Sequence, residues 1–184
     1  MTIRAIAGVL CLSISTPAFA SYCVYIGRNL TASGHAFLAG YGDEPSSHWL
    51  EIVPARDHAP GTTISVGLTA LAQLPGILQQ IPQVRRTAKY FSMDYSEHMG
   101  MPPPLTNGGL NQHGVAARDV ASPSRQELLD MTPNPQQGGP HYSDLARIVL
   151  ERARSAREAV EIVGDLINRY GYSTYGGNSH LFAD

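Results

Sequence analysis

The chain has 184 residues, of which 43% are hydrophobic and 15% are charged, and its formal net charge at pH 7 is −2. This composition supplies a hydrophobic core and suits one ordinary domain, so an intrinsically disordered chain is not expected. The charged residues form no basic block, which argues against nucleic acid as a partner. The 18 glycines and 13 prolines favour a fold rich in turns over a helical bundle.

The first twenty residues have the three-part pattern of a secretory signal peptide. A basic start at Met1–Arg4 precedes an apolar run at Ala5–Ile14, and the segment ends in the small-x-small signal Ala18-Phe19-Ala20. The apolar run is shorter than the roughly 20 residues that a membrane-spanning helix needs. We therefore expect cleavage after residue 20, a mature chain over residues 21–184, a periplasmic or secreted location and no membrane anchor.

Strands are predicted over the first two thirds of the mature chain. Ser21–Gly27 and His35–Tyr41 are expected to form a hairpin, because turn residues separate two runs with strand composition. Further strands are predicted at His48–Val53, Thr62–Gly67 and Thr87–Tyr95, with a hairpin at Leu110–Val120. Two segments that contain prolines are predicted to be irregular, Leu74–Pro82 and Gly100–Gly109.

After a polar, proline-rich connection at Pro123–Pro140, the pattern becomes helical at Tyr142–Arg154 and Ser155–Tyr170. The residues expected to form the two apolar helix faces are Leu145, Ile148, Val149 and Ala153, and then Ala159, Val160, Val163, Leu166 and Ile167. Ser155 and Glu158 predict a capping box, and Gly171 is a helix stop signal. Strands followed by a helix pair indicate an α+β fold.

The new N-terminus is the most distinctive chemical group expected in the mature chain. Cleavage would give Ser21 a free α-amine, and such amines have a pKa of about 7.7–8.0. The amine can accept the proton of its own hydroxyl, so one residue would supply nucleophile and base. Cleavage also removes Cys11 and leaves Cys23 as the only thiol. The seven histidines show no i, i+4 pairing, and the chain carries no standard metal, hydrolase or phosphate-loop motif.

Several segments, spread in order over nearly the whole mature chain, share a further pattern. They are Gly27, Gly34, Asp43, Asn107–Val115 (NGGLNQHGV), Leu150–Val160 (LERARSAREAV), Tyr170–Tyr172 and Phe182–Asp184. In this pattern the chain resembles the dipeptidase A family of N-terminal-nucleophile hydrolases, which are mostly bacterial cysteine dipeptidases. The resemblance implies an αββα sandwich, hydrolysis of short peptides without a cofactor, and a full length of several hundred residues. The apolar end at Leu181–Asp184, which has no visible strand partner in the sequence, likewise suggests the front part of a longer protein.

The resemblance leaves two candidates for the nucleophile. If Gly27 and Gly34 are held to the two glycines of the family pattern, the nucleophile position falls on Ser21, which is also the residue that signal cleavage exposes. Matching the family's usual cysteine to Cys23 shortens the spacing to both glycines and requires removal of Tyr22. We favour Ser21 and expect Cys23 to lie on the same strand face, either lining the pocket or serving as a small buried hydrophobic residue.

The resemblance also implies roles for two polar residues. Asp43 matches an acid that orients the amine of the nucleophile, although an exposed loop aspartate is an equal alternative. Family members often carry an arginine three residues before this acid, where the present chain has Gly40, so the resemblance supplies no arginine here to bind a carboxylate. Asn111 either donates to an oxyanion or simply forms a turn with Gly114.

The hypothesis that follows is an exported peptide hydrolase, a dipeptidase, in which Ser21 attacks the scissile carbonyl and its α-amine shuttles the proton. Short peptides are its expected substrates. One alternative is a non-catalytic binding module or inactive truncated fragment, whose missing strands would leave apolar faces exposed. Another is an acylase that cleaves non-peptide amides.

Overall fold

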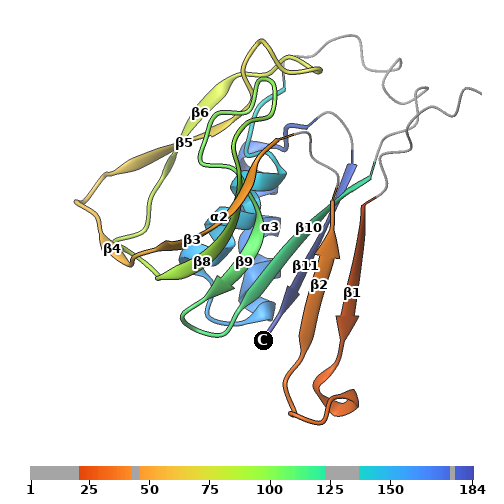
Figure 1. Ribbon diagram of the computed structural model, residues 1–184. Helices are drawn as coiled ribbons and strands as arrows, with labels where there is room; N and C mark the ends of the chain where they lie inside the picture. Colours follow the sequence, from red (N-terminus) through yellow and green to blue (C-terminus); the bar gives the residue numbers. More distant parts are fainter. Residues whose placement is uncertain (1–20, 43–45, 123–136, 175–176) are drawn as a thin grey trace, which may run out of the picture.

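The computed structural model describes residues 21–42, 46–122, 137–174 and 177–184 (Figure 1). The predicted signal peptide at residues 1–20, Asp43 and most of the proline-rich connection lie outside the described residues. The described part combines sheets with two helices, so the predicted α+β class is confirmed.

The chain opens with the predicted hairpin. Strand β1 (Tyr22–Ile26) pairs antiparallel with β2 (Phe37–Tyr41), and the register places Tyr22 opposite Tyr41. A short 3-10 helix, η1 (Arg28–Leu30), and a turn that ends at Gly34 connect them. Gly34 has a φ of 70°, a conformation that glycine adopts without strain.

The central sheet has five antiparallel strands in the order β11-β10-β9-β8-β3. Their bounds are β3 His48–Val53, β8 Tyr90–Tyr95, β9 Thr106–Asn111, β10 Ala116–Ser122 and β11 Gly177–Ala183. Two smaller pairs lie outside it: β4 (Arg56–Asp57) with β7 (Arg86–Thr87), and β5 (Thr63–Gly67) with β6 (Leu78–Pro82).

Three predictions are corrected by this sheet arrangement. The apolar C-terminal run does have a strand partner, because β11 pairs with β10 and Phe182 lies opposite Ala117. The predicted irregular segment Gly100–Gly109 ends inside β9, where Gly108 and Gly109 let neighbouring strands approach closely. A Cβ atom on Gly109 would lie 1.9 Å from the carbonyl oxygen of Phe91. Likewise β6 is a strand despite Pro82, which stands at its last position.

Helices α2 (Tyr142–Arg152) and α3 (Ala156–Tyr170) cover one face of the sheet (Figure 1). The four apolar residues predicted on the first helix face are all fully buried. The second face is narrower than predicted, because Ala159 and Leu166 are buried whereas Val160 and Ile167 are 56% and 37% exposed. Ser155 caps α3 by accepting from the Glu158 N–H, but the Glu158 carboxylate accepts from the Arg154 N–H, so only half of the predicted capping box forms.

The β1–β2 hairpin lies on the other face of the sheet. It shares no strand pairing with the five-stranded sheet, yet it contacts β10 and β11. In β10, Ala117 packs in the helix-side core, and its neighbour Arg118 therefore points to the opposite face, where it lies against Gly40 of β2. The layers are therefore helices, five-stranded sheet and hairpin.

A buried histidine caps α2 and makes the fold sensitive to acid. His141 accepts from the backbone N–H of Asp144 through Nδ1 at 3.2 Å, and it is 1% exposed. Burial is the main cause that lowers the pKa of His141 to about 4, against an ordinary value near 6.5. The unfolded chain therefore binds a proton at higher pH than the folded chain. Stability contributed by neutral His141 is complete above pH 6.5 and is lost as the pH falls towards 4.

We expect His141→Asn to flatten this acid loss. Asparagine keeps an N-cap acceptor but does not titrate, whereas the wild type should lose up to about 1.4 kcal/mol per pH unit at this residue. The measurement is urea unfolding between pH 7 and pH 4. Replacement of the exposed His113 by asparagine is the matched control, and an equal flattening in that variant would contradict the assignment.

Candidate functional site

Ser21 and Cys23 stand at the start of the hairpin, on the same side of β1. Ser21 is half-buried and directly precedes the strand, whereas Tyr22 between them is 60% exposed. Tyr22 pairs with Tyr41 across the hairpin, and the two tyrosine rings stack with their centroids 5.8 Å apart. The alternation of a strand puts Ser21 and Cys23 on one face, as the sequence predicts, and contacts of the hairpin with β10 and β11 show that this face lies towards the central sheet.

The surroundings of Cys23 favour its protonated thiol over the thiolate. Its Sγ donates to the carbonyl oxygen of Ala39 at 2.8 Å. Burial raises the pKa of the Cys23 thiol, and the positive charge of Arg118 only partly offsets this effect. A thiol is nucleophilic as the thiolate, so this environment disfavours the nucleophilic form of Cys23.

Asn111 makes the bonds of a turn residue and is not among the residues that line the cavity described below. Its Oδ1 accepts from the N–H groups of His113 and Val115, both at 3.0 Å. Its Nδ2 donates to the carbonyl oxygens of Leu150 and Ala153, at 3.2 and 2.7 Å, in the last turn of α2. Both amide hydrogens are used and the residue is 4% exposed, so the geometry favours the turn-forming alternative for Asn111 over the oxyanion role.

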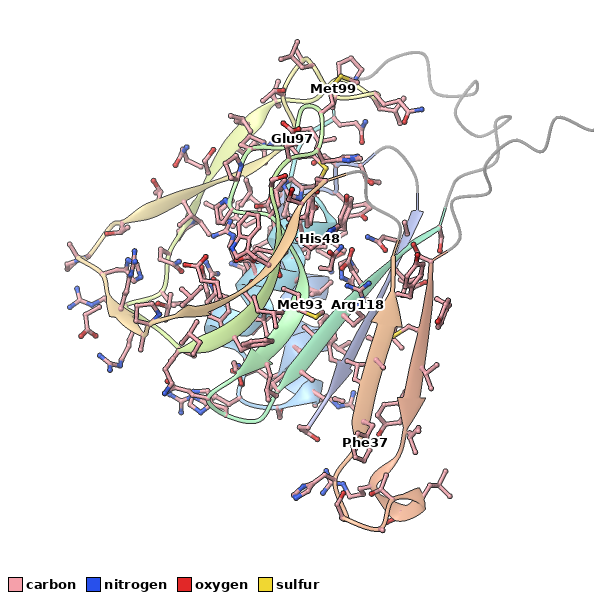
Figure 2. The ribbon with its side chains drawn as sticks, in the orientation of Figure 1. Phe37, His48, Met93, Glu97, Met99 and Arg118 are labelled. Carbon is pink, nitrogen blue, oxygen red and sulfur yellow. The ribbon has the colours of Figure 1, made fainter. Side chains whose placement is uncertain are left out.

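A cavity of about 300 Å³ lies between the hairpin and the sheet. Figure 2 shows three of its residues, His48, Met93 and Arg118, near β2. The residues that line it are Gly40, Tyr41, Gly42, His48, Trp49, Leu50, Met93, Asp94, Asn107 and Arg118. This volume is at the lower end of the range for small-molecule sites, so the cavity can accept a ligand the size of a dipeptide.

Of the predicted site residues, Ser21 and Cys23 belong to the hairpin that borders this cavity, Asn111 lies elsewhere, and Asp43 lies outside the described residues. The sequence interpretation missed His48, Asn107 and Arg118. A signal for Arg118 was present, because it is one of two charged residues, with Asp119, in the otherwise apolar segment Val115–Val120. Asn107 begins one of the segments that carry the family resemblance, but the segment itself does not distinguish it from Asn111.

Charged residues behind the sheet form a paired structural network. Arg147 of α2 is 6% exposed and contacts Asp144 at 3.0 Å and Glu151 at 3.4 Å. Breaking these buried pairs would leave an uncompensated charge, so we assign Arg147 and its two partners to the stability of α2.

Asp94 on β8 is not one of these ion pairs and lines the cavity instead. It accepts a short hydrogen bond from Ser92, and burial is the main cause that raises the pKa of its carboxyl group.

Within the described residues, no group of three or more His, Cys, Asp and Glu side chains has the arrangement to hold a metal ion. Neither of the two helices described is long and apolar enough to span a membrane.

Comparison with protein-family models matches residues 82–184, more than half of the chain, to Peptidase family C69. The matched range contains the helices, Asn107 and Arg118, whereas the β1–β2 hairpin precedes it. No curated protein matches the chain.

Proposed function

The chain belongs to peptidase family C69, the dipeptidase A family, and from that membership we propose that it is an exported dipeptidase whose nucleophile is Ser21. The family membership supports peptide substrates. The observation that carries the assignment of the nucleophile is the hairpin geometry, which places Ser21 at the end of β1 that adjoins Gly40 and Gly42 in the wall of the cavity.

In the proposed reaction, the Ser21 hydroxyl attacks the scissile carbonyl and the α-amine of the same residue accepts its proton. The amine then protonates the leaving amino group, and water hydrolyses the acyl-enzyme. Because Asn111 is committed to the turn, we assign the oxyanion to a backbone N–H or to Asn107, which lines the cavity. Asp43 keeps its proposed role of orienting the amine.

Ser21 is preferred to Cys23 on two grounds. The thiol of Cys23 donates to a backbone carbonyl, and its pKa is raised by burial. Its α-nitrogen also becomes a free amine only if Tyr22 is removed, and Tyr22 is paired and stacked with Tyr41. In this proposal Cys23 lies two residues after the nucleophile, on the same face of the strand.

We further propose the N-terminal-nucleophile αββα sandwich as the fold. The order of helices, five-stranded sheet and hairpin corresponds to an α-β-β arrangement and supports this fold. In this proposal residues 1–20 are the signal peptide, residues 21–184 are the N-terminal part of the dipeptidase domain, and the mature protein is periplasmic or secreted.

The mass and N-terminal sequence of the exported protein test the nucleophile directly. We expect a mature chain that starts at Ser21. A start at Cys23 would transfer the role to the thiol, and a chain that retains Met1 would exclude a mechanism based on a free amine. The acylase alternative is separated by assaying the same preparation on dipeptides and on non-peptide amides.

One observation favours the binding-module alternative. The sheet face opposite the helices exposes apolar side chains on neighbouring strands: Leu50 is 65% exposed, Ile52 69% and Leu110 49%. Exposed apolar patches of this kind mark surfaces that pack on another surface. A chain without peptidase activity that remains folded would support this second candidate.

A further inference from the structure

Arg118 is a buried cation with unused hydrogen-bonding capacity. The residue is 7% exposed, and its Nη1 donates to the Asn107 carbonyl oxygen at 3.4 Å, which is a long contact. Its Nε has no hydrogen-bond partner. In the part of the chain that the structure describes, no carboxylate forms an ion pair with Arg118. Burial of an unpaired guanidinium is costly, so its retention calls for an anionic ligand.

The hairpin is shaped around this side chain. A Cβ atom at residue 40 would lie 2.4 Å from Nε of Arg118 and 2.9 Å from its Cγ, so only glycine leaves room for the arginine. Arg118 therefore lies beside residue 40, the position at which this chain has glycine instead of the arginine that the family resemblance would supply. Among the described residues, its position is set by packing against Gly40 and not by an ion pair with an acid.

The guanidinium also lies in the right place for a substrate. Arg118 lines the cavity together with Gly40, Tyr41 and Gly42, which belong to the end of the hairpin that carries Ser21. Figure 2 shows Arg118 between the sheet and this hairpin, away from Phe37 near the turn of the hairpin. A dipeptide whose scissile carbonyl meets Ser21 carries its α-carboxylate one residue further on. A planar guanidinium binds a carboxylate through two parallel hydrogen bonds.

We infer that Arg118 binds the free α-carboxylate of the peptide substrate and so restricts the enzyme to peptides that end one residue after the scissile bond. This inference rests on the proposed function and deepens it, because it names the group that would make the peptidase a dipeptidase. Peptides with an amidated C-terminus lack the charge that Arg118 recognises.

Equilibrium binding tests the inference without turnover. The mature Ser21→Ala protein is titrated with alanyl-alanine and with alanyl-alanine amide, with and without Arg118→Met. We expect Arg118→Met to weaken binding of the free acid at least tenfold and to leave binding of the amide within about twofold, because the cavity walls remain. Arg118→Lys, which keeps the charge but loses the fork, should give an intermediate affinity for the acid. Arg86→Met, at an exposed arginine on β7, is the matched control.

Equal weakening of acid and amide, unchanged binding of the acid, or no binding of either peptide to the protein that retains Arg118 would overturn the inference. Near-UV circular dichroism identifies a variant that fails to fold. If Arg118→Met does not fold, the affinities of Arg118→Lys for the acid and for the amide decide the test instead. Binding of the acid that depends on Arg118, without hydrolysis by the wild type, would refute the proposed function alone. Hydrolysis by the wild type with no acid preference that depends on Arg118 would refute only this inference.

Discussion

Replacement of Ser21 by alanine is expected to abolish dipeptide hydrolysis, with a fall in kcat of at least about a thousandfold. The variant removes the attacking oxygen but keeps the α-amine and the small residue that signal cleavage needs. Ser21 precedes β1 and is not one of the buried residues that form the hydrophobic core, so the unfolding midpoint should stay unchanged. The measurement is kcat on a panel of dipeptides, combined with thermal unfolding of the same preparation.

Two variants in the same hairpin complete this experiment. Ser33→Ala removes a serine hydroxyl from the connecting turn and should retain full activity. Cys23→Ala should keep most of the activity, because the thiol only donates to the Ala39 carbonyl. Full activity of Ser21→Ala together with an inactive Cys23→Ala protein would contradict the assignment and restore the thiol as nucleophile.

Replacement of Asn111 by alanine is expected to destabilise the protein by roughly 4 kcal/mol. The amide makes four hydrogen bonds, two to N–H groups of its own turn and two to carbonyl oxygens at the end of α2, each worth about 1 kcal/mol. The substitution therefore disconnects the β9–β10 hairpin from the helix layer. The measurement is the free energy of unfolding in urea, with kcat determined on the folded fraction.

Asn111→Asp provides the comparison within the same site. Aspartate keeps the two acceptor interactions with the turn but cannot donate to Leu150 and Ala153, so it should also lose stability. If Asn111→Ala instead folds as stably as the wild type and loses only kcat, the residue acts on the oxyanion and the structural role is wrong.

Local sequence patterns were sufficient for much of the fold. The first hairpin and both helices were predicted because turn residues, alternation and helical spacing act over a few positions. The pairing of β11 with β10 was not predictable in this way, since its partner lies about sixty residues earlier in the chain and no local pattern specifies it. Gly108 and Gly109 were misread for a related reason. A glycine in sequence indicates a turn, whereas here it permits a close approach by a strand from elsewhere in the chain.

The candidate site divides in the same way. Ser21 and Cys23 could be identified because the signal-peptide pattern and the position in a strand are properties of consecutive residues. Asn111 was correctly placed in its turn, but the helix carbonyls that occupy its amide come from residues 150 and 153.

The sequence by itself determined the α+β class and the family, because composition, periodicity and short motifs are local. The residue that signal cleavage would expose stays a prediction. Only the tertiary structure decided which polar groups are occupied and which face a cavity. In the sequence, Arg118 is simply a charged residue of a predicted strand, and only the packing of β2 on β10 shows that it is buried beside Gly40. The absent side chain of Gly40 then gives Arg118 space, and the side chain is buried without an ion pair to any described carboxylate.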